Sequence, residues 1–125
     1  MKFVIVGTAY PYRGGIAHYN ALLYNALRKE HKVKLLNFKR QYPSLFFPGN
    51  TQIEEGKPSI QVDSDRILDS INPISWILTW LRIHRYKPDL VIFKYWMPFF
   101  APCFGVIGFL SKFISGFKVL FILDN

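Results

Sequence analysis

The sequence predicts an α/β fold of the Rossmann type, a three-layer α/β/α arrangement with a five-stranded, mainly parallel sheet. Short apolar runs alternate with longer segments in which apolar residues recur at helical spacing. The 125 residues are 50% hydrophobic and 18% aromatic, which suits one packed domain. Right-handed crossovers give the strand order 3-2-1-4-5, with the switch point between the first and fourth strands.

The first strand and helix are defined by the amino-terminal residues. Residues 2–7 form a continuous apolar run, which predicts a buried strand. A loop over residues 8–15 follows, and residues 16–29 then carry apolar side chains at helical spacing. Arg28 and Lys29 favour the negative end of the helix dipole, so the helix is expected to end there.

The middle of the chain predicts two further strands and a long connection. Residues 33–38 indicate the second strand, and the alternation in residues 59–62 indicates a short third strand. Between them, residues 39–58 contain proline and glycine and are expected to form a connection that is not rigid.

The second helix has a clear start and stop. Asn72 can cap its first turn, and Pro73 costs nothing there because that N–H has no helical partner. Four apolar residues are expected to continue on one face: Ile74, Ile77, Leu78 and Leu81. The helix is expected to end near Tyr86, before the stop signal in residues 87–89.

The last elements are strongly apolar. Residues 90–93 predict a strand buried on both faces, an apolar helix begins at about Pro98, and residues 118–123 form the final strand. Residues 96–111 are almost uncharged but fall short of the roughly 20 residues that a bilayer core needs. A buried or membrane-grazing helix is therefore favoured over a membrane span.

Charge and cysteine usage limit the function classes. The formal net charge of +8 indicates an anionic partner: a nucleotide diphosphate, a phospholipid headgroup, a lipid-linked phosphate or nucleic acid. Cys103 is the single cysteine, so the chain contains neither a disulfide nor a cysteine metal site, and a reducing, cytoplasmic setting fits best. The amino-terminal apolar run is too short for a signal peptide.

The loop over residues 8–15 is the first candidate site, since ligands of open parallel sheets bind beyond the carboxyl ends of the strands at the switch point. Gly14 and Gly15 directly precede a helix, where free N–H groups and the helix dipole favour an anion. A plain tight turn explains the two glycines about equally well. A dinucleotide fingerprint does not fit, because the glycine spacing differs and no acidic residue ends the second strand.

Residues 94–98 form the second candidate segment. Lys94, Tyr95 and Trp96 put a cation and two aromatic rings at the cleft edge, suited to a sugar ring or a phosphorylated acceptor. Core packing is an equal competitor for Trp96 and Met97. Tyr10 and Tyr12, on the first loop, are also placed for acceptor contacts, whereas His18 is expected to be a surface histidine without a catalytic task.

The second helix is both apolar and cationic, a pattern compatible with a helix that lies on a membrane surface. The candidate residues for membrane contact are Trp76, Trp80, Arg82 and Arg85. Packing against the sheet explains the apolar half of this helix equally well.

Two motifs resemble a known family. Residues 11–20, Pro-Tyr-Arg-Gly-Gly-Ile-Ala-His-Tyr-Asn, with Leu22 and Leu23 behind them, are similar to the opening of glycosyltransferase family 4, which has the GT-B fold. Residues 86–92, Tyr-Lys-Pro-Asp-Leu-Val-Ile, match that family's Lys-Pro-Asp start of the fourth strand. The double glycine is moderately specific, and together with the element order the motifs cover nearly the whole chain.

The resemblance implies a retaining transferase that moves a sugar from a UDP- or GDP-type donor to a hydroxyl without a cofactor or metal. This chain would be the N-terminal, acceptor-side domain. A C-terminal domain absent from it would hold most of the nucleotide-sugar. Gly14 and Gly15 would face the donor diphosphate and sugar, and Arg13 would either add a cation or remain a solvated loop arginine.

The resemblance also implies a role in cell-surface polysaccharide or glycolipid synthesis, with a sugar or lipid-linked acceptor and possible peripheral attachment to the anionic cytoplasmic leaflet. The expected histidine and glutamates of the family lie beyond Asn125, so no catalytic residue is named and the chain alone is expected to be inactive. The alternative is a non-catalytic Rossmann-like module that binds an anionic ligand or a membrane. Nucleic-acid binding is disfavoured, because the basic residues are scattered through helix ends and loops.

Overall fold

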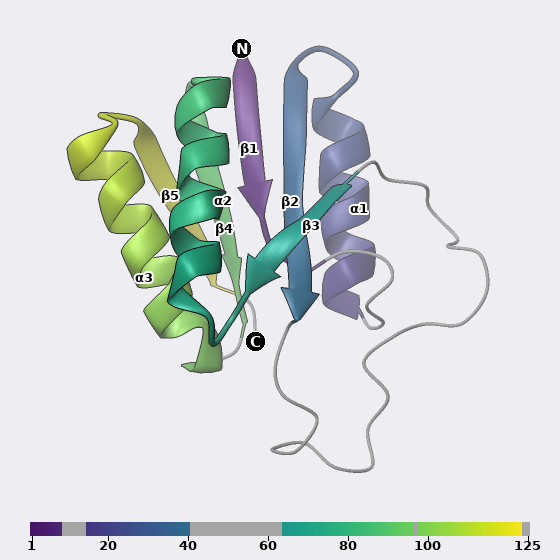
Figure 1. Ribbon diagram of the computed structural model, residues 1–125. Coiled ribbons are helices and arrows are strands. Elements are labelled where there is room, and N and C mark those ends of the chain that lie inside the picture. The colour runs from purple at the N-terminus through teal and green to yellow at the C-terminus, as the bar shows by residue number, and fades with distance from the viewer. Residues whose placement is uncertain (9–14, 41–63, 97, 124–125) are drawn as a thin grey trace.

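The computed structural model describes residues 1–8, 15–40, 64–96 and 98–123, which form a three-layer α/β fold (Figure 1). The strands are β1 (Lys2–Val6), β2 (Lys32–Arg40), β3 (Ser64–Asp69), β4 (Leu90–Tyr95) and β5 (Lys118–Leu123). All neighbouring strands pair in parallel, in the order β3-β2-β1-β4-β5. The predicted fold class and strand order are thus confirmed.

Helices cover both faces of this sheet. Helix α1 (Gly15–Leu27) lies on one face, and α2 (Pro73–Tyr86) and α3 (Ala101–Phe109) lie on the other (Figure 1). A 3-10 turn, η2 (Pro98–Phe100), leads into α3, and a π-helical turn, η3 (Leu110–Ile114), follows it. The predicted apolar helix from about Pro98 is therefore present, with a change of helical type at each end.

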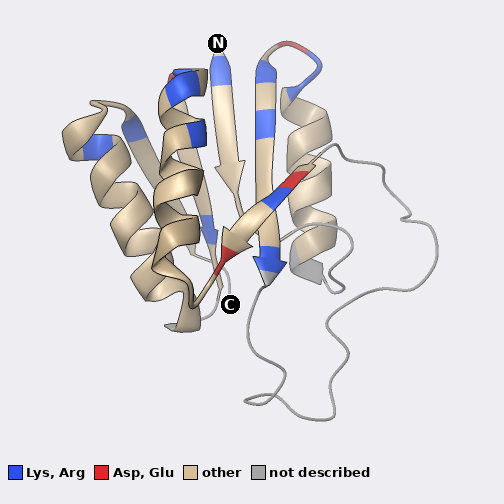
Figure 2. Ribbon diagram, viewed as in Figure 1, with Lys and Arg blue, Asp and Glu red and all other residues tan. Residues whose placement is uncertain are grey.

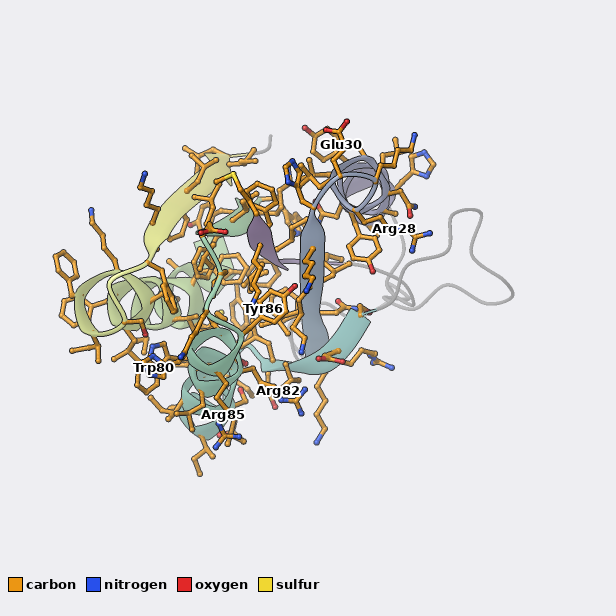
Figure 3. The ribbon with its side chains drawn as sticks, turned by 90° about the horizontal axis from the view of Figure 1, so that it is seen from above. Arg28, Glu30, Trp80, Arg82, Arg85 and Tyr86 are labelled. Carbon is orange, nitrogen blue, oxygen red and sulfur yellow. The ribbon has the colours of Figure 1, made fainter. Side chains whose placement is uncertain are left out.

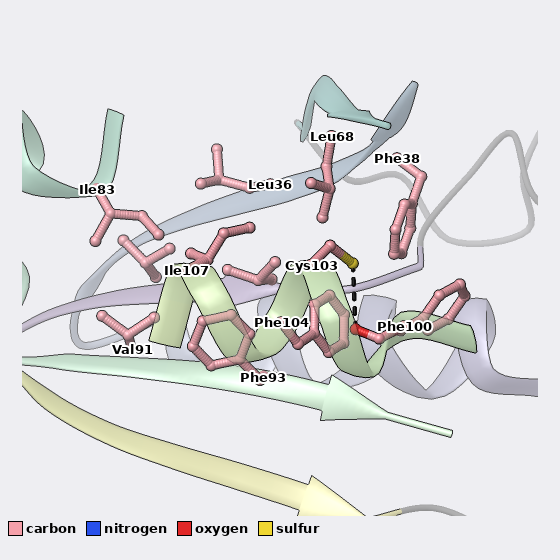
Figure 4. Close-up of a cluster of buried hydrophobic side chains, with 12 residues drawn as sticks. Leu36, Phe38, Leu68, Ile83, Val91, Phe93, Phe100, Cys103, Phe104 and Ile107 are labelled. Carbon is pink, nitrogen blue, oxygen red and sulfur yellow. Dashed lines mark hydrogen bonds between the residues drawn. The ribbon is translucent and has the colours of Figure 1, made fainter. Parts of the chain in front are cut away.

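Strand alternation divides the interior into two cores. The larger one lies between the sheet and the α2–α3 layer and is rich in aromatic rings (Figure 4). Its buried members include Val4, Val6, Leu36, Phe38, Leu68, Ile83, Val91, Phe93, Phe100, Cys103, Phe104 and Ile107. The smaller core, on the α1 side, is built on Ile5, Tyr24, Leu35 and Ile92.

Both ends of α2 form as predicted. The Asn72 side chain accepts a hydrogen bond of 3.0 Å from the backbone N–H of Ile74, and Pro73 occupies the first turn. At the other end Lys87 adopts a left-handed conformation, with φ 55°, and its N–H donates to the Ile83 carbonyl. Local capping chemistry therefore sets the length of this helix.

The apolar face predicted for α2, with Ile74, Ile77 and Leu78, points away from the sheet. The helix buries Ser75, Thr79 and Ile83, whereas Ile74 and Ile77 are exposed. The polar side chains can be buried because they are hydrogen-bonded: the Ser75 hydroxyl donates to Asp69 O at 2.9 Å and Thr79 donates to Ser75 O at 2.7 Å. Satisfied hydroxyls thus replace the apolar stripe that the sequence pattern predicted.

The third strand lies at Ser64–Asp69, a range that the sequence left unassigned. The predicted range, residues 59–62, and most of the predicted connection lie outside the described residues. Lys39 and Arg40 belong to β2, which is longer than predicted. β3 is an edge strand with one neighbour, so Asp65 and Arg66 can sit in it while remaining partly hydrated.

The carboxyl-terminal part of the fold follows the prediction closely. Gly116, with φ 78°, turns the chain after η3, and β5 has the predicted bounds. Across the part of the chain that the structure describes, no helix combines the length and the apolarity that crossing a membrane requires.

Candidate functional site

The candidate site lies where β1 and β4 end side by side at the carboxyl edge of the sheet. β1 leads into Gly7 and Thr8, β4 ends with Lys94 and Tyr95, and α1 begins at Gly15 on the same edge (Figure 1). The topology rule for parallel sheets predicted this meeting point. Three separate elements therefore contribute residues to one small region.

Thr8 is fixed from two sides. The Asn20 side chain on α1 donates a hydrogen bond of 2.7 Å to the Thr8 carbonyl, and the Trp96 indole N–H donates one of 3.2 Å to the Thr8 hydroxyl. Thr8 is almost completely buried. The first residue of the predicted ligand loop is therefore anchored to α1 and to the end of β4.

Lys94 lies beneath this anchor point. Its side chain is 0% exposed, and its ammonium group lies 3.9 Å from the centroid of the Tyr19 ring on α1. An ammonium over an aromatic face is attracted to the ring quadrupole, which offsets part of the cost of burying the charge. A positive charge is thus held inside the protein directly below the edge where the loop leaves β1.

Gly7 permits the close approach of the three elements. A Cβ at this position would lie 3.0 Å from Asn20 Nδ2 and 3.0 Å from Lys94 Cβ. Any larger residue would push α1 or β4 away from β1. The absence of a side chain at Gly7 is therefore part of how Asn20 and Lys94 reach their positions.

Two further features of the site are the side-chain oxygen of Asn20 and the ring of Trp96. Asn20 is fully buried, yet its Oδ1 accepts no hydrogen bond within the described part of the chain. Buried polar atoms are usually paired, so an amide oxygen without a partner at this position is unusual. Trp96 packs edge-on against Phe100, with ring centroids 5.5 Å apart, and stays half-buried.

The predicted site residues are only partly described. Gly15 is the first residue of α1, which puts it at the carboxyl edge as expected. Gly14, Arg13, Tyr10 and Tyr12, predicted for donor and acceptor contacts, lie outside the described residues, as does Met97. His18 is an exposed residue of α1.

Residues 94–96 do not form one surface. Lys94 points toward α1, whereas Tyr95 packs on the opposite face near Phe104, with ring centroids 6.4 Å apart. Successive residues of a strand point to opposite faces, so the two side chains cannot contact the same ligand from one side. Trp96, after the strand, returns to the edge beside Thr8.

Sequence reasoning missed Asn20. It lies in the inward stripe of α1, whose other members are the small or apolar residues Ala17, Ala21 and Tyr24. An amide at a core position of an apolar stripe needs a specific hydrogen-bond partner. The presence of Asn20 in this stripe was therefore the sequence signal that could have identified it.

The tryptophans of α2 are engaged inside the protein. The Trp76 indole donates to Asp69 O at 2.8 Å, and the Trp80 indole donates to Ser115 Oγ at 2.9 Å. Arg82 forms an ion pair of 3.0 Å with Asp65, and Arg85 is exposed. Of the four candidate membrane residues, Arg85 is exposed and points outward in Figure 3, whereas the other three side chains bind groups of this chain.

A second basic region lies at the opposite, amino edge of the sheet. A hollow of about 630 Å³ there is lined by Lys2, Arg28, Lys32 and Lys87 together with Glu30 and Asp89. Figure 3 looks down on this edge, with Arg28 and Glu30 labelled at the end of α1. The two acidic side chains partly neutralise the four basic ones, so this hollow attracts an anion less specifically than its lysines suggest.

No cluster of three or more potential metal-binding His, Cys, Asp or Glu side chains occurs among the described residues. Cys103 is buried in the larger core and donates a hydrogen bond of 3.3 Å to the Phe100 carbonyl. Burial raises the pKa of its thiol to about 12, so Cys103 is a protonated core residue.

Comparison with known proteins gives a structural likeness. No protein-family model matches the chain, and no curated protein matches it significantly. A solved structure that does match is the lipopolysaccharide outer core galactosyltransferase WaaB in its apo form, with a TM-score of 0.58 and 11% sequence identity over 98% of this chain. The chain spans 33% of that protein's length. At this identity the likeness concerns the fold, and the chain therefore has the fold of one part of a glycosyltransferase.

Proposed function

We propose that this chain is the acceptor-side domain of a GT-B glycosyltransferase, which moves a sugar from a nucleotide-sugar to an acceptor hydroxyl. The observation that carries the proposal is the construction of the carboxyl edge, where Thr8 is anchored by Asn20 and Trp96 above a buried Lys94. The fold likeness to a galactosyltransferase across nearly the whole chain supports it. In this proposal a second domain holds most of the donor.

The donor diphosphate is assigned to the start of α1. Departure of the nucleotide leaves negative charge on the diphosphate, and a preorganised helix N-terminus stabilises such charge without reorganisation. In this proposal Gly14 and Gly15 present backbone N–H groups and Arg13 adds a cation. Lys94 was expected to contact the acceptor, but because it is buried we assign it instead a fixed positive charge beneath the loop.

The acceptor is assigned to the aromatic residues around this edge. Trp96 is held by Thr8 and half-exposed, so its ring can stack on a sugar. Tyr10 and Tyr12 complete the acceptor contacts in this proposal, whereas Tyr95 faces the α3 side. A retaining reaction, a UDP- or GDP-sugar donor, and a cytoplasmic role in polysaccharide or glycolipid synthesis are further parts of the proposal that rest on the family resemblance.

The test is a donor-hydrolysis and transfer assay on the chain together with its donor-binding domain, against a panel of nucleotide-sugars. Gly15→Leu is expected to lower turnover by about a hundredfold with little change in Tm, because a side chain would block approach to the helix N-terminus. Gly105→Leu is the matched control, since a Cβ there meets nothing within 4 Å. It should keep full turnover.

The rival function is a non-catalytic module that binds an anionic ligand. The net charge of +8 favours anion binding in either case. Binding of a nucleotide-sugar without hydrolysis or transfer of any sugar in the panel would favour the module. Equal losses of turnover and Tm in Gly15→Leu would indicate that the glycine serves only the turn.

A further inference from the structure

Helix α3 is apolar around its whole circumference. Cys103, Phe104 and Ile107 on its inner side are buried in the larger core. On its outer side Val106 is 37% exposed and Phe109 is 57% exposed. The outer side continues into η3, where Phe113 is 65% exposed and Ile114 is 61% exposed. A helix that is hydrophobic all round normally has apolar material on every side, whereas the outer side of α3 is exposed within the described part of the chain.

Helix α2 presents the same kind of outer face. Its inward positions include the hydroxyl residues Ser75 and Thr79, whereas Ile74 is 70%, Ile77 43% and Leu78 49% exposed. The two helices pack against each other in one layer (Figure 1). We call these exposed residues the outer apolar surface: Ile74, Ile77, Leu78, Val106, Phe109, Phe113 and Ile114.

The helical segments that carry this surface bear charges of one sign, and the acidic residues beside it, Asp65 and Asp69, belong to β3. Neither α2, α3 nor η3 contains an acidic residue. Exposed cations lie at the carboxyl end of α2, in η3 and at the start of β5, where Figure 2 shows blue on all three elements. They are Arg85, Lys112 and Lys118. The part of the apolar surface next to η3 and the end of α2 is thus bordered by positive charge, and its partner should offer apolar material next to anions.

We propose that the outer apolar surface docks onto an anionic lipid membrane surface. Phe109 and Phe113, whose ring centroids lie 5.0 Å apart, would enter the headgroup region as one aromatic ridge. Lys112, beside the Phe113 ring, and Arg85 would contact lipid phosphates. The inference rests on exposure and charge alone and is independent of sugar transfer.

The surface is also held in shape for docking. Ser115, directly after η3, accepts a hydrogen bond from the Trp80 indole at 2.9 Å and contacts His84 Nδ1 at 2.8 Å. These bonds tie η3 to α2. The tryptophans of α2 therefore brace the surface from within, and the phenylalanines of the α3–η3 segment take the role of membrane anchors that the sequence pattern gave to Trp76 and Trp80.

Other occupants fit less well. In a symmetric contact between two copies, the same patch faces itself, so the basic residues of both copies would be brought near each other. Nucleic acid would satisfy the cations but offers no apolar counterpart for Phe109, Phe113 and Ile74. An anionic bilayer supplies both phosphate groups and apolar chains.

The experiment is vesicle flotation of the full chain. The chain is expected to bind vesicles of phosphatidylcholine mixed with phosphatidylglycerol much more strongly than vesicles of phosphatidylcholine alone. Phe109→Ser and Phe113→Ser should each lower partitioning about tenfold, the cost of losing one buried aromatic side chain. Leu22→Ser, at a 50% exposed position on α1 in the opposite layer, is the matched control and should bind as the parent does.

The contribution of the basic residues to membrane binding is tested separately. Lys112→Gln and Arg85→Gln should each lower binding about fivefold at low salt, whereas Lys29→Gln, an exposed site at the end of α1, should not. The proposal is overturned if the chain does not bind phosphatidylglycerol vesicles, or if Leu22→Ser weakens binding as much as Phe113→Ser. It is also overturned if light scattering shows a dimer that Phe109→Ser dissociates while vesicles have no effect.

Discussion

The chain after β1 lies very close to α1 and β4 at Gly7. Gly7→Ala would bring a Cβ to 3.0 Å from both Asn20 Nδ2 and Lys94 Cβ, and the neighbouring elements would have to shift. We expect a loss of about 1–3 kcal/mol in the free energy of unfolding, measured by urea denaturation. Gly105→Ala, where a Cβ meets nothing within 4 Å, should instead add about 0.5–1 kcal/mol. Equal effects of the two changes would contradict the assigned packing.

Cys103 makes the alkaline stability of the protein predictable. Burial raises its thiol pKa from 9.0 to about 12, so the folded protein keeps the proton that the unfolded chain releases. The contribution of this group is complete below pH 9.0 and declines as the pH rises toward about 12. Urea unfolding at rising pH should therefore show a steeper loss in the parent than in Cys103→Ala. Parallel losses would place the thiol in solvent.

At the scale of elements, the end of α2 carries strain that can be removed. Lys87 has φ 55° and ψ 60°, a left-handed conformation that glycine adopts without penalty. Lys87→Gly should raise the free energy of unfolding by about 1 kcal/mol, measured by chemical denaturation. Gly116→Ala is the reverse change, because it puts a side chain at a residue with φ 78°. It should lower the free energy of unfolding by a similar amount. No gain in Lys87→Gly would indicate that its side-chain contacts outweigh the backbone strain.

Elements with local signals could be predicted, and those that depend on their neighbours could not. Asn72 and Pro73 start α2, and the residues after Tyr86 stop it, through chemistry within a few positions. The residue range of β3 was not predicted, because an edge strand tolerates charged residues such as Asp65. The sequence left open which way the apolar face of α2 points, because the buried side depends on Ser75 finding its partner, Asp69, on a different element.

The candidate site also has features that the sequence predicted and features that it did not. Topology alone predicted that the carboxyl ends of β1 and β4 would lie side by side, and they do. The burial of Lys94 and the identity of the Asn20 partner, Thr8, could not be predicted, because both depend on how closely α1 approaches β4 across Gly7. That distance is a property of packing and has no signature in residue spacing.

At the scale of the whole molecule, the described residues place positive charge in regions with different surroundings. The carboxyl edge holds one buried cation, the amino-edge hollow mixes basic with acidic residues, and the α2–α3 layer combines exposed cations with apolar side chains. The net charge of +8 alone could not distinguish these regions. We expect a nucleotide at the first and lipid at the third.

The central claim is that a nucleotide diphosphate binds at the carboxyl edge between β1 and β4. Titration of the ¹⁵N-labelled chain, joined to its donor-binding domain, with UDP-glucose and GDP-mannose, followed by NMR, tests it most directly. We predict that the amides of Gly7, Thr8 and Ala17 and the indole of Trp96 shift progressively with added ligand. Shifts confined to the amino edge, at Lys2, Lys32 and Lys87, would contradict the claim.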